Sequence, residues 1–152
     1  LYLDFTKQWY DENSSPQFRE LRDKMMVTLQ KESELSEIVQ LVGPDALPDR
    51  ERLTLEIARM IREDYLQQHA FHKMDTYCPL EKQYLMLTTI DLYNALAHQA
   101  LDSGKSIDDI NSLSIRDDIA RMKYLPNETF SDEHQKLMDS LKEQFNSLGE
   151  SE

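Results

Sequence analysis

The spacing of apolar residues is the feature that most constrains the fold of this chain. Apolar side chains recur at three- and four-residue steps, the spacing that places them on one face of an α-helix. The first series consists of Phe18, Leu21, Met25, Leu29, Leu35, Ile38 and Val42. No segment alternates between apolar and polar residues for long enough to predict a strand. We therefore expect an all-α protein, a multi-helix bundle of about five to six helices.

The boundaries of the first two helices are marked by prolines and a glycine. Ser15 can cap a helix, and Pro16 fits its first position. Gly43-Pro44 ends that helix, because glycine tolerates a left-handed cap and proline cannot continue a helix. Pro48 begins a second helix, with Leu53, Ile57, Met60, Ile61 and Tyr65 as its buried face. The pattern predicts a helix-turn-helix hairpin at 16–68.

The C-terminal half shows a third helix and three serine caps. Pro79 begins an apolar helix that Ser103-Gly104 ends. Shorter helices follow. Their predicted caps are Ser106 with Asp109, Ser114 with Asp117, and Ser131.

The charge balance excludes some partners. The chain has 17 basic and 29 acidic residues and a formal net charge of −12. Such a surface repels phosphate backbones and anionic lipids, so we expect no binding to nucleic acid. No apolar run reaches the roughly 20 residues of a membrane span, so we expect no direct membrane insertion. The acidity either maintains solubility or faces a basic partner.

The sequence contains no convincing catalytic or metal-binding motif. Gly104-Lys105-Ser106 resembles the end of a phosphate-binding loop, but the first glycine of that motif is replaced by Gln99. His69 and His72 lack a third ligand at helical spacing. Cys78 is the single cysteine, so no internal disulfide can form. We expect no catalytic residue, metal site or cofactor within this chain.

One long segment resembles a known family. The sequence from Glu37 to Leu53, EIVQLVGPDALPDRERL, continues into Ile57 to Phe71 and then Asp75 to Pro79. This order of motifs is similar to the C-terminal helical domain of the catalytic chain, also called the alpha chain, of archaeal (A-type) and vacuolar (V-type) rotary ATPases. The resemblance implies that residues 1–152 form one C-terminal helical-bundle domain. It also implies a nucleotide-binding domain upstream of Leu1 that holds the catalytic and magnesium-binding groups.

The resemblance also implies two sites. An aromatic residue of the family stacks on adenine at the turn after the second helix, so the implied adenine pocket comprises Phe71, Tyr65, Gln68 and Ala70. The implied contact with the rotor comprises Pro44, Asp45, Ala46, Leu47, Pro48, Asp49 and Arg50. Acidic and basic residues alternate in this loop, so a steric push explains torque transfer better than net charge.

The implied function is that of a lever domain in a rotary ATP synthase. It couples ATP synthesis or hydrolysis to proton or sodium transport, with ATP or ADP and Mg²⁺ bound in the intact subunit. The implied partners are adenine nucleotide, the central-stalk rotor subunits, and the non-catalytic nucleotide-binding subunit of the alternating hexamer. The implied location is cytoplasmic, peripheral to the membrane in the ATPase head. The alternative is a self-standing helical adaptor whose grooves bind a partner helix.

Overall fold

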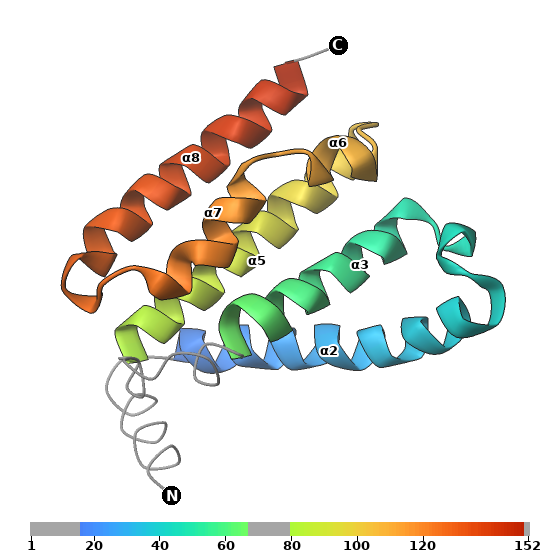
Figure 1. Cartoon of the computed structure of the whole chain (residues 1–152), viewed down its shortest axis with the longest axis horizontal. Coiled ribbons are helices and arrows are strands. Elements are labelled where there is room, and N and C mark those ends of the chain that lie inside the picture. Colours follow the sequence, from blue (N-terminus) through green and yellow to red (C-terminus); the bar gives the residue numbers. More distant parts are fainter. Residues whose placement is uncertain (1–15, 67–79, 151–152) are drawn as a thin grey trace, which may run out of the picture.

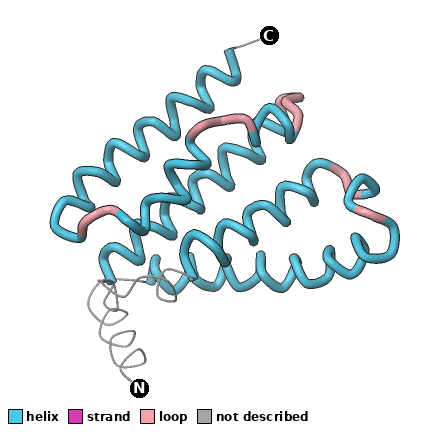
Figure 2. The backbone as a smooth tube through the Cα atoms, viewed as in Figure 1, coloured by secondary structure: helices cyan, strands magenta, loops and turns pink. Residues whose placement is uncertain are grey.

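The computed structural model describes residues 16–66 and 80–150 of the 152-residue chain. These ranges contain six α-helices and no strand (Figure 2). The all-α prediction is therefore confirmed. The helices are α2 (Pro16–Val42), α3 (Asp49–Met60), α5 (Leu80–Asp102), α6 (Ile107–Asn111), α7 (Ile115–Arg121) and α8 (Phe130–Glu150).

The predicted hairpin is formed by α2 and α3, which lie side by side (Figure 1). A 3₁₀ turn, η1 (Pro44–Ala46), joins them. Gly43 precedes this turn with a φ of 87°, a backbone conformation that strains any residue with a Cβ atom. The hairpin is thus confirmed over 16–66. Its second arm differs from the sequence prediction, because it changes from an α-helix to a π-helix, η2 (Ile61–Leu66).

Helix α5 is the centre of the bundle, with α3 packed on one side and α8 on the other (Figure 1). The ring of Phe18 on α2 lies 5.6 Å from the ring of Tyr84 on α5. On the opposite side, the rings of Tyr93 and Phe145 meet edge to face at 5.6 Å. Side chains of every described α-helix contribute to the one hydrophobic core.

Of the three serine caps predicted from the sequence, one is confirmed and two are wrong. Ser106 forms the predicted capping box with Asp109 at the start of α6. The predicted box at Ser114 is wrong, because Ser114 has helical dihedral angles and its side chain caps nothing. Instead, the side-chain oxygen of Gln144 on α8 accepts from the N–H of Ile115 at 2.9 Å. The prediction for Ser131 is also wrong, because α8 already begins at Phe130, after a 3₁₀ turn.

A buried lysine secures the segment between α7 and α8. The ammonium group of Lys82, on α5, donates to the backbone carbonyls of Lys123 and Leu125 at 3.1 and 2.8 Å. It also donates to Oδ1 of Asn127 at 3.1 Å and lies over the ring of Phe130. This one cation therefore orders the turns η3 (Met122–Tyr124) and η4 (Asn127–Thr129).

None of the described helices is both long enough and apolar enough to cross a membrane. Residues 16–66 and 80–150 contain no group of three or more potential metal ligands. The pair His69 and His72 lies outside these ranges.

Candidate functional site

The tip of the hairpin carries the residues predicted to contact a rotor. Pro44, Asp45 and Ala46 form an exposed turn. Leu47 follows the turn and is buried, although it lies outside the main hydrophobic core. Pro48 is exposed and precedes the first turn of α3. The loop thus presents a short exposed surface that is followed by one buried apolar residue, Leu47.

The last turns of α2 add an apolar surface beside this loop. The periodicity predicted that Ile38 and Val42 belong to the buried stripe, but both are exposed. Leu41 between them is 85% exposed. We call Ile38, Leu41 and Val42 the apolar tip. The prediction was wrong at this end because periodicity indicates which side of a helix is apolar, but not whether another element covers that side.

Asp49 and Arg50 were predicted to contact the rotor, and the structure places them against the bundle. A guanidinium nitrogen of Arg50 donates to the carboxylate of Asp102, at the end of α5, at 3.0 Å. The carboxylate of Asp49 accepts from the N–H of Ile107, in the first turn of α6, at 3.3 Å. These two residues attach the base of the loop to the end of the α5–α6 segment.

The predicted adenine pocket is only partly described. Phe71, Gln68 and Ala70 lie outside the described residues. Tyr65 lies on η2 and is 9% exposed, with its ring in the hydrophobic core. Its hydroxyl group donates to Oε1 of Gln83 on α5 at 3.5 Å. Tyr65 therefore packs η2 against α5 and the core.

The π-helix η2 is tied to two other parts of the domain. A guanidinium nitrogen of Arg62 lies 2.5 Å from a carboxylate oxygen of Glu32 on α2. The ammonium group of Lys123, in η3, donates to the backbone carbonyl of Glu63 at 2.8 Å. Short π-helical segments interrupt α-helices at functional sites more often than elsewhere. Here the segment connects the hairpin with the C-terminal half, immediately before the predicted adenine turn.

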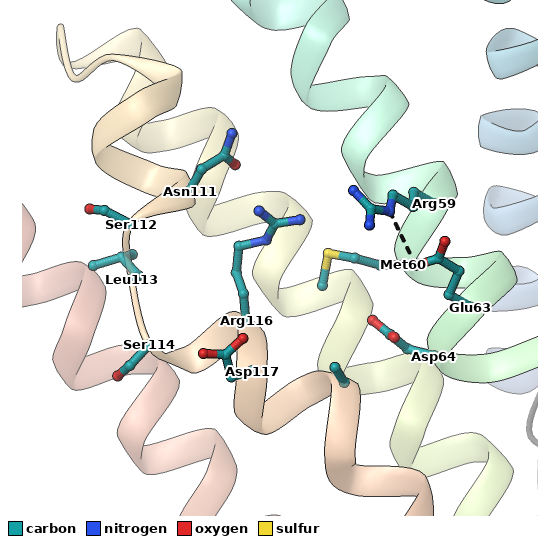
Figure 3. A pocket seen from close by; sticks show the side chains of 11 residues that line it. Arg59, Met60, Glu63, Asp64, Asn111, Ser112, Leu113, Ser114, Arg116 and Asp117 are labelled. Atoms are coloured by element: carbon teal, nitrogen blue, oxygen red, sulfur yellow. Dashed lines mark hydrogen bonds and ion pairs between the residues drawn. The ribbon is translucent and has the colours of Figure 1, made fainter.

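Sequence reasoning did not identify a polar cavity that adjoins η2 (Figure 3). One wall is formed by Arg59 and Met60 of α3 with Glu63 and Asp64 of η2. The other is formed by residues of α6, α7 and their connection, including Asn111, Arg116 and Asp117. These two groups are some 50 residues apart in the chain, so no local motif could have revealed their proximity.

Burial raises the pKa of Asp64 to about 6, and the positive charge of Lys123 opposes the shift. Nearby, a guanidinium nitrogen of Arg116 pairs with the carboxylate of Glu56 on α3. The guanidinium of Arg59 pairs with Glu63 at 3.1 Å. The two arginines beside the cavity are thus already neutralised by carboxylates of the hairpin.

Comparison with known proteins identifies the family. Residues 7–110 match the family described as the C-terminal domain of V and A type ATP synthase. The chain belongs to this family. It is 56% identical over 148 residues to the A subunit of the A-type ATP synthase of Methanopyrus kandleri, a match that covers 97% of the chain. The corresponding proteins of Staphylothermus marinus and Thermococcus sibiricus are 48% and 49% identical over 148 residues, again 97% of the chain.

This ATP synthase domain spans about a quarter of the relatives it matches, since the aligned residues are 25% of each of those three proteins. The resemblance inferred from the Glu37–Leu53 segment is thereby confirmed. In these relatives the matching segment is part of a much longer protein. The family match at residues 7–110 also includes the whole hairpin, the π-helix and the segment predicted to form the adenine turn, so all the predicted site residues lie within it.

Proposed function

We propose that this ATP synthase domain is the lever of a rotary ATP synthase catalytic subunit, and that it couples nucleotide occupancy to movement of the rotor. The observation that carries the proposal is the hairpin, whose two ends match the two implied sites. Its exposed turn and apolar tip lie at one end, and η2, which directly precedes the implied adenine turn in the sequence, lies at the other. A movement imposed at one end is transmitted to the other through packed helices.

At the rotor end, the contact is made by a projecting surface rather than by net charge. Pro44, Asp45 and Ala46 are exposed, and the adjacent Leu41 offers a large apolar side chain. Asp49 and Arg50 hold the loop to the bundle, so a push on the turn is transmitted to α5 and α6. The partner is a central-stalk rotor subunit with an apolar surface that complements the tip.

At the nucleotide end, Phe71 stacks on adenine, and Gln68 and Ala70 shape the turn around it. Tyr65 supports this turn from the core, with its ring packed and its hydroxyl hydrogen-bonded to Gln83. When nucleotide binds, the turn moves toward the base and carries η2 with it. The ion pair between Arg62 and Glu32 passes this movement to α2.

The intact subunit binds ATP or ADP with Mg²⁺ through its nucleotide-binding domain and couples synthesis or hydrolysis to proton or sodium transport. It alternates with a non-catalytic nucleotide-binding subunit in a cytoplasmic head that is peripheral to the membrane. The lever domain performs no phosphoryl chemistry by itself.

The rotor contact is tested by crosslinking in the assembled complex. With Cys78 replaced by serine and a cysteine placed on the facing surface of a central-stalk subunit, Ala46→Cys should form a disulfide adduct with that subunit when a mild thiol oxidant is added. This adduct should block turnover until it is reduced. Lys142→Cys, on the exposed side of α8, is the matched control and should form no such adduct. Adducts of Ala46→Cys exclusively with stator subunits would refute the lever assignment.

The adenine contact is tested in the full-length subunit with Phe71→Ala. Stacking of an aromatic side chain on a base contributes roughly 1–3 kcal/mol, so nucleotide affinity should fall by about five- to a hundred-fold. The phosphate contacts belong to another domain, so kcat should fall much less than kcat/KM. Phe71→Trp should retain most of the affinity. Unchanged affinity in a folded Phe71→Ala protein would remove this residue from the pocket.

A further inference from the structure

The polar cavity beside η2 has the size of a site for a small group. Its volume is about 410 Å³, within the range of small-molecule sites. Figure 3 shows Asp64 directed into it from η2 and Asp117 directed into it from α7. The cavity therefore lies between the hairpin and the C-terminal half, with a carboxylate on each side.

Asp64 is the unusual member of this lining. It is 8% exposed, yet within 16–66 and 80–150 its carboxylate accepts no hydrogen bond and forms no ion pair. Buried carboxylates are otherwise paired or hydrogen-bonded, because removing their charge from water is costly. The carboxylate of Asp117 likewise has no hydrogen-bond partner or ion pair among the described residues.

The basic groups nearby act on Asp64 through their charges, but none of the described ones forms an ion pair with either carboxylate. Arg116 is engaged by Glu56, and Arg59 by Glu63. Lys123 donates its hydrogen bond to the backbone of Glu63 and acts on Asp64 only through its charge. After these pairs are taken into account, the cavity retains two unpaired carboxylates, and its lining also holds one unpaired basic donor, the buried Nε–H of Arg116. The lining residues, all of which the structure describes, still carry one more carboxylate than guanidinium group. An anionic ligand is therefore disfavoured, and a cation is favoured.

We propose that this cavity binds a guanidinium group, whose N–H hydrogens are accepted by the Asp64 and Asp117 carboxylates from opposite walls. A guanidinium is planar and carries five donors in a fixed fork, so one group can bridge two carboxylates. An ammonium group is a compact point charge and spans the two walls less well. This proposal concerns different residues from the implied adenine turn and the apolar tip, and it does not depend on the proposed function.

The guanidinium has two possible sources, a free guanidinium compound or an arginine side chain of a neighbouring protein. Both present the same chemistry to the cavity. The probe that represents them is N-trifluoroacetyl-arginine amide, with the uncharged citrulline analogue as its matched control. Its fluorine signal reports binding from the ligand side. The N–H signals of Arg116 Nε and of the Asn111 side chain, both in the cavity wall, report it from the protein side.

In a titration of the chain at pH 7.5, the arginine probe should shift these wall signals saturably, and the citrulline probe should not. Asp64→Asn should weaken binding by about tenfold or more, because a charged hydrogen-bond partner is lost. Asp117→Asn should weaken it less, since this carboxylate is exposed. Asp23→Asn, on the exposed side of α2, should leave the affinity unchanged. Equal binding of both probes, or no binding by a folded wild-type chain, would overturn the proposal.

The two sources are distinguished in the assembled complex. Unchanged affinity for the fluorinated probe would mean that the site is open and takes a free compound. Exclusion of the probe, with weaker association between subunits in Asp64→Asn, would assign the site to a neighbour's arginine. Exclusion of the probe without any effect of Asp64→Asn on association would refute a role for the site in the complex.

Discussion

Replacing Asp64 by asparagine should make the domain more stable at neutral pH. Asparagine has nearly the same shape as aspartate and removes the charge that burial disfavours. Burial raises the pKa of Asp64 from 3.8 to about 6, so the folded state holds this proton more tightly than the unfolded state does. The stabilisation that the bound proton provides is complete below pH 4 and is lost as the pH rises through about 6.

The magnitude follows from the size of this shift. A difference of about two pKa units corresponds to about 3 kcal/mol between the protonated and ionised forms. At pH 7.5 the ionised carboxylate therefore costs the folded wild type about that much relative to a protonated one. Asparagine also loses the attraction of Lys123, Arg116 and Arg59 for the carboxylate. We therefore expect Asp64→Asn to raise the free energy of unfolding by about 1–2 kcal/mol at pH 7.5.

The assay is urea denaturation of wild type and variant at a series of pH values from 4 to 8, followed by circular dichroism. The increase in the free energy of unfolding of Asp64→Asn over wild type should be largest above pH 7 and should decrease steadily toward pH 4. Burial lowers the pKa of His134, so this residue makes the free energy of unfolding rise with pH. Its contribution is the same in wild type and variant and cancels when the two are subtracted. Asp23→Asn is the control and should show no such trend. A destabilised Asp64→Asn, or a gain independent of pH, would show that Asp64 has a partner that holds it ionised.

Three further predictions concern the core and the helix ends. Gln144→Ala should lower the free energy of unfolding by about 1 kcal/mol, because the N–H of Ile115 at the start of α7 loses its acceptor. The control Gln135→Ala, at an exposed position, should change this free energy little in the same urea titration. Tyr93→Phe should be neutral or stabilising by up to about 1 kcal/mol in thermal unfolding, because its buried hydroxyl has no partner among the described residues; a clear loss would indicate a bound water. Lys82→Met should lower the free energy of unfolding by about 2–3 kcal/mol, because two partly buried carbonyls and Asn127 lose their donor. The loss should be visible as a lower melting temperature.

The helices and the family could be predicted from the sequence, because both are indicated by residues that lie close together in the chain. The three- and four-residue spacing of apolar side chains places them on one helical face, whatever the rest of the chain does. Gly43 and the capping box at Ser106 act within a few residues, so their effects were predictable. The segment from Glu37 to Leu53 carries the family resemblance in consecutive residues, and the comparisons confirmed it.

The tertiary structure decided every feature that depends on residues far apart in the chain. Gln144 replaced Ser114 as the cap of α7, because a side chain from another helix reached the first N–H. Ile38 and Val42 were exposed although they continue an apolar stripe, because periodicity indicates a face but not whether a neighbour covers it. Asp64 and Asp117 line one cavity only because the hairpin folds against α7. A sequence specifies which side of a helix is apolar, whereas burial, pKa and pairing depend on what packs against that side.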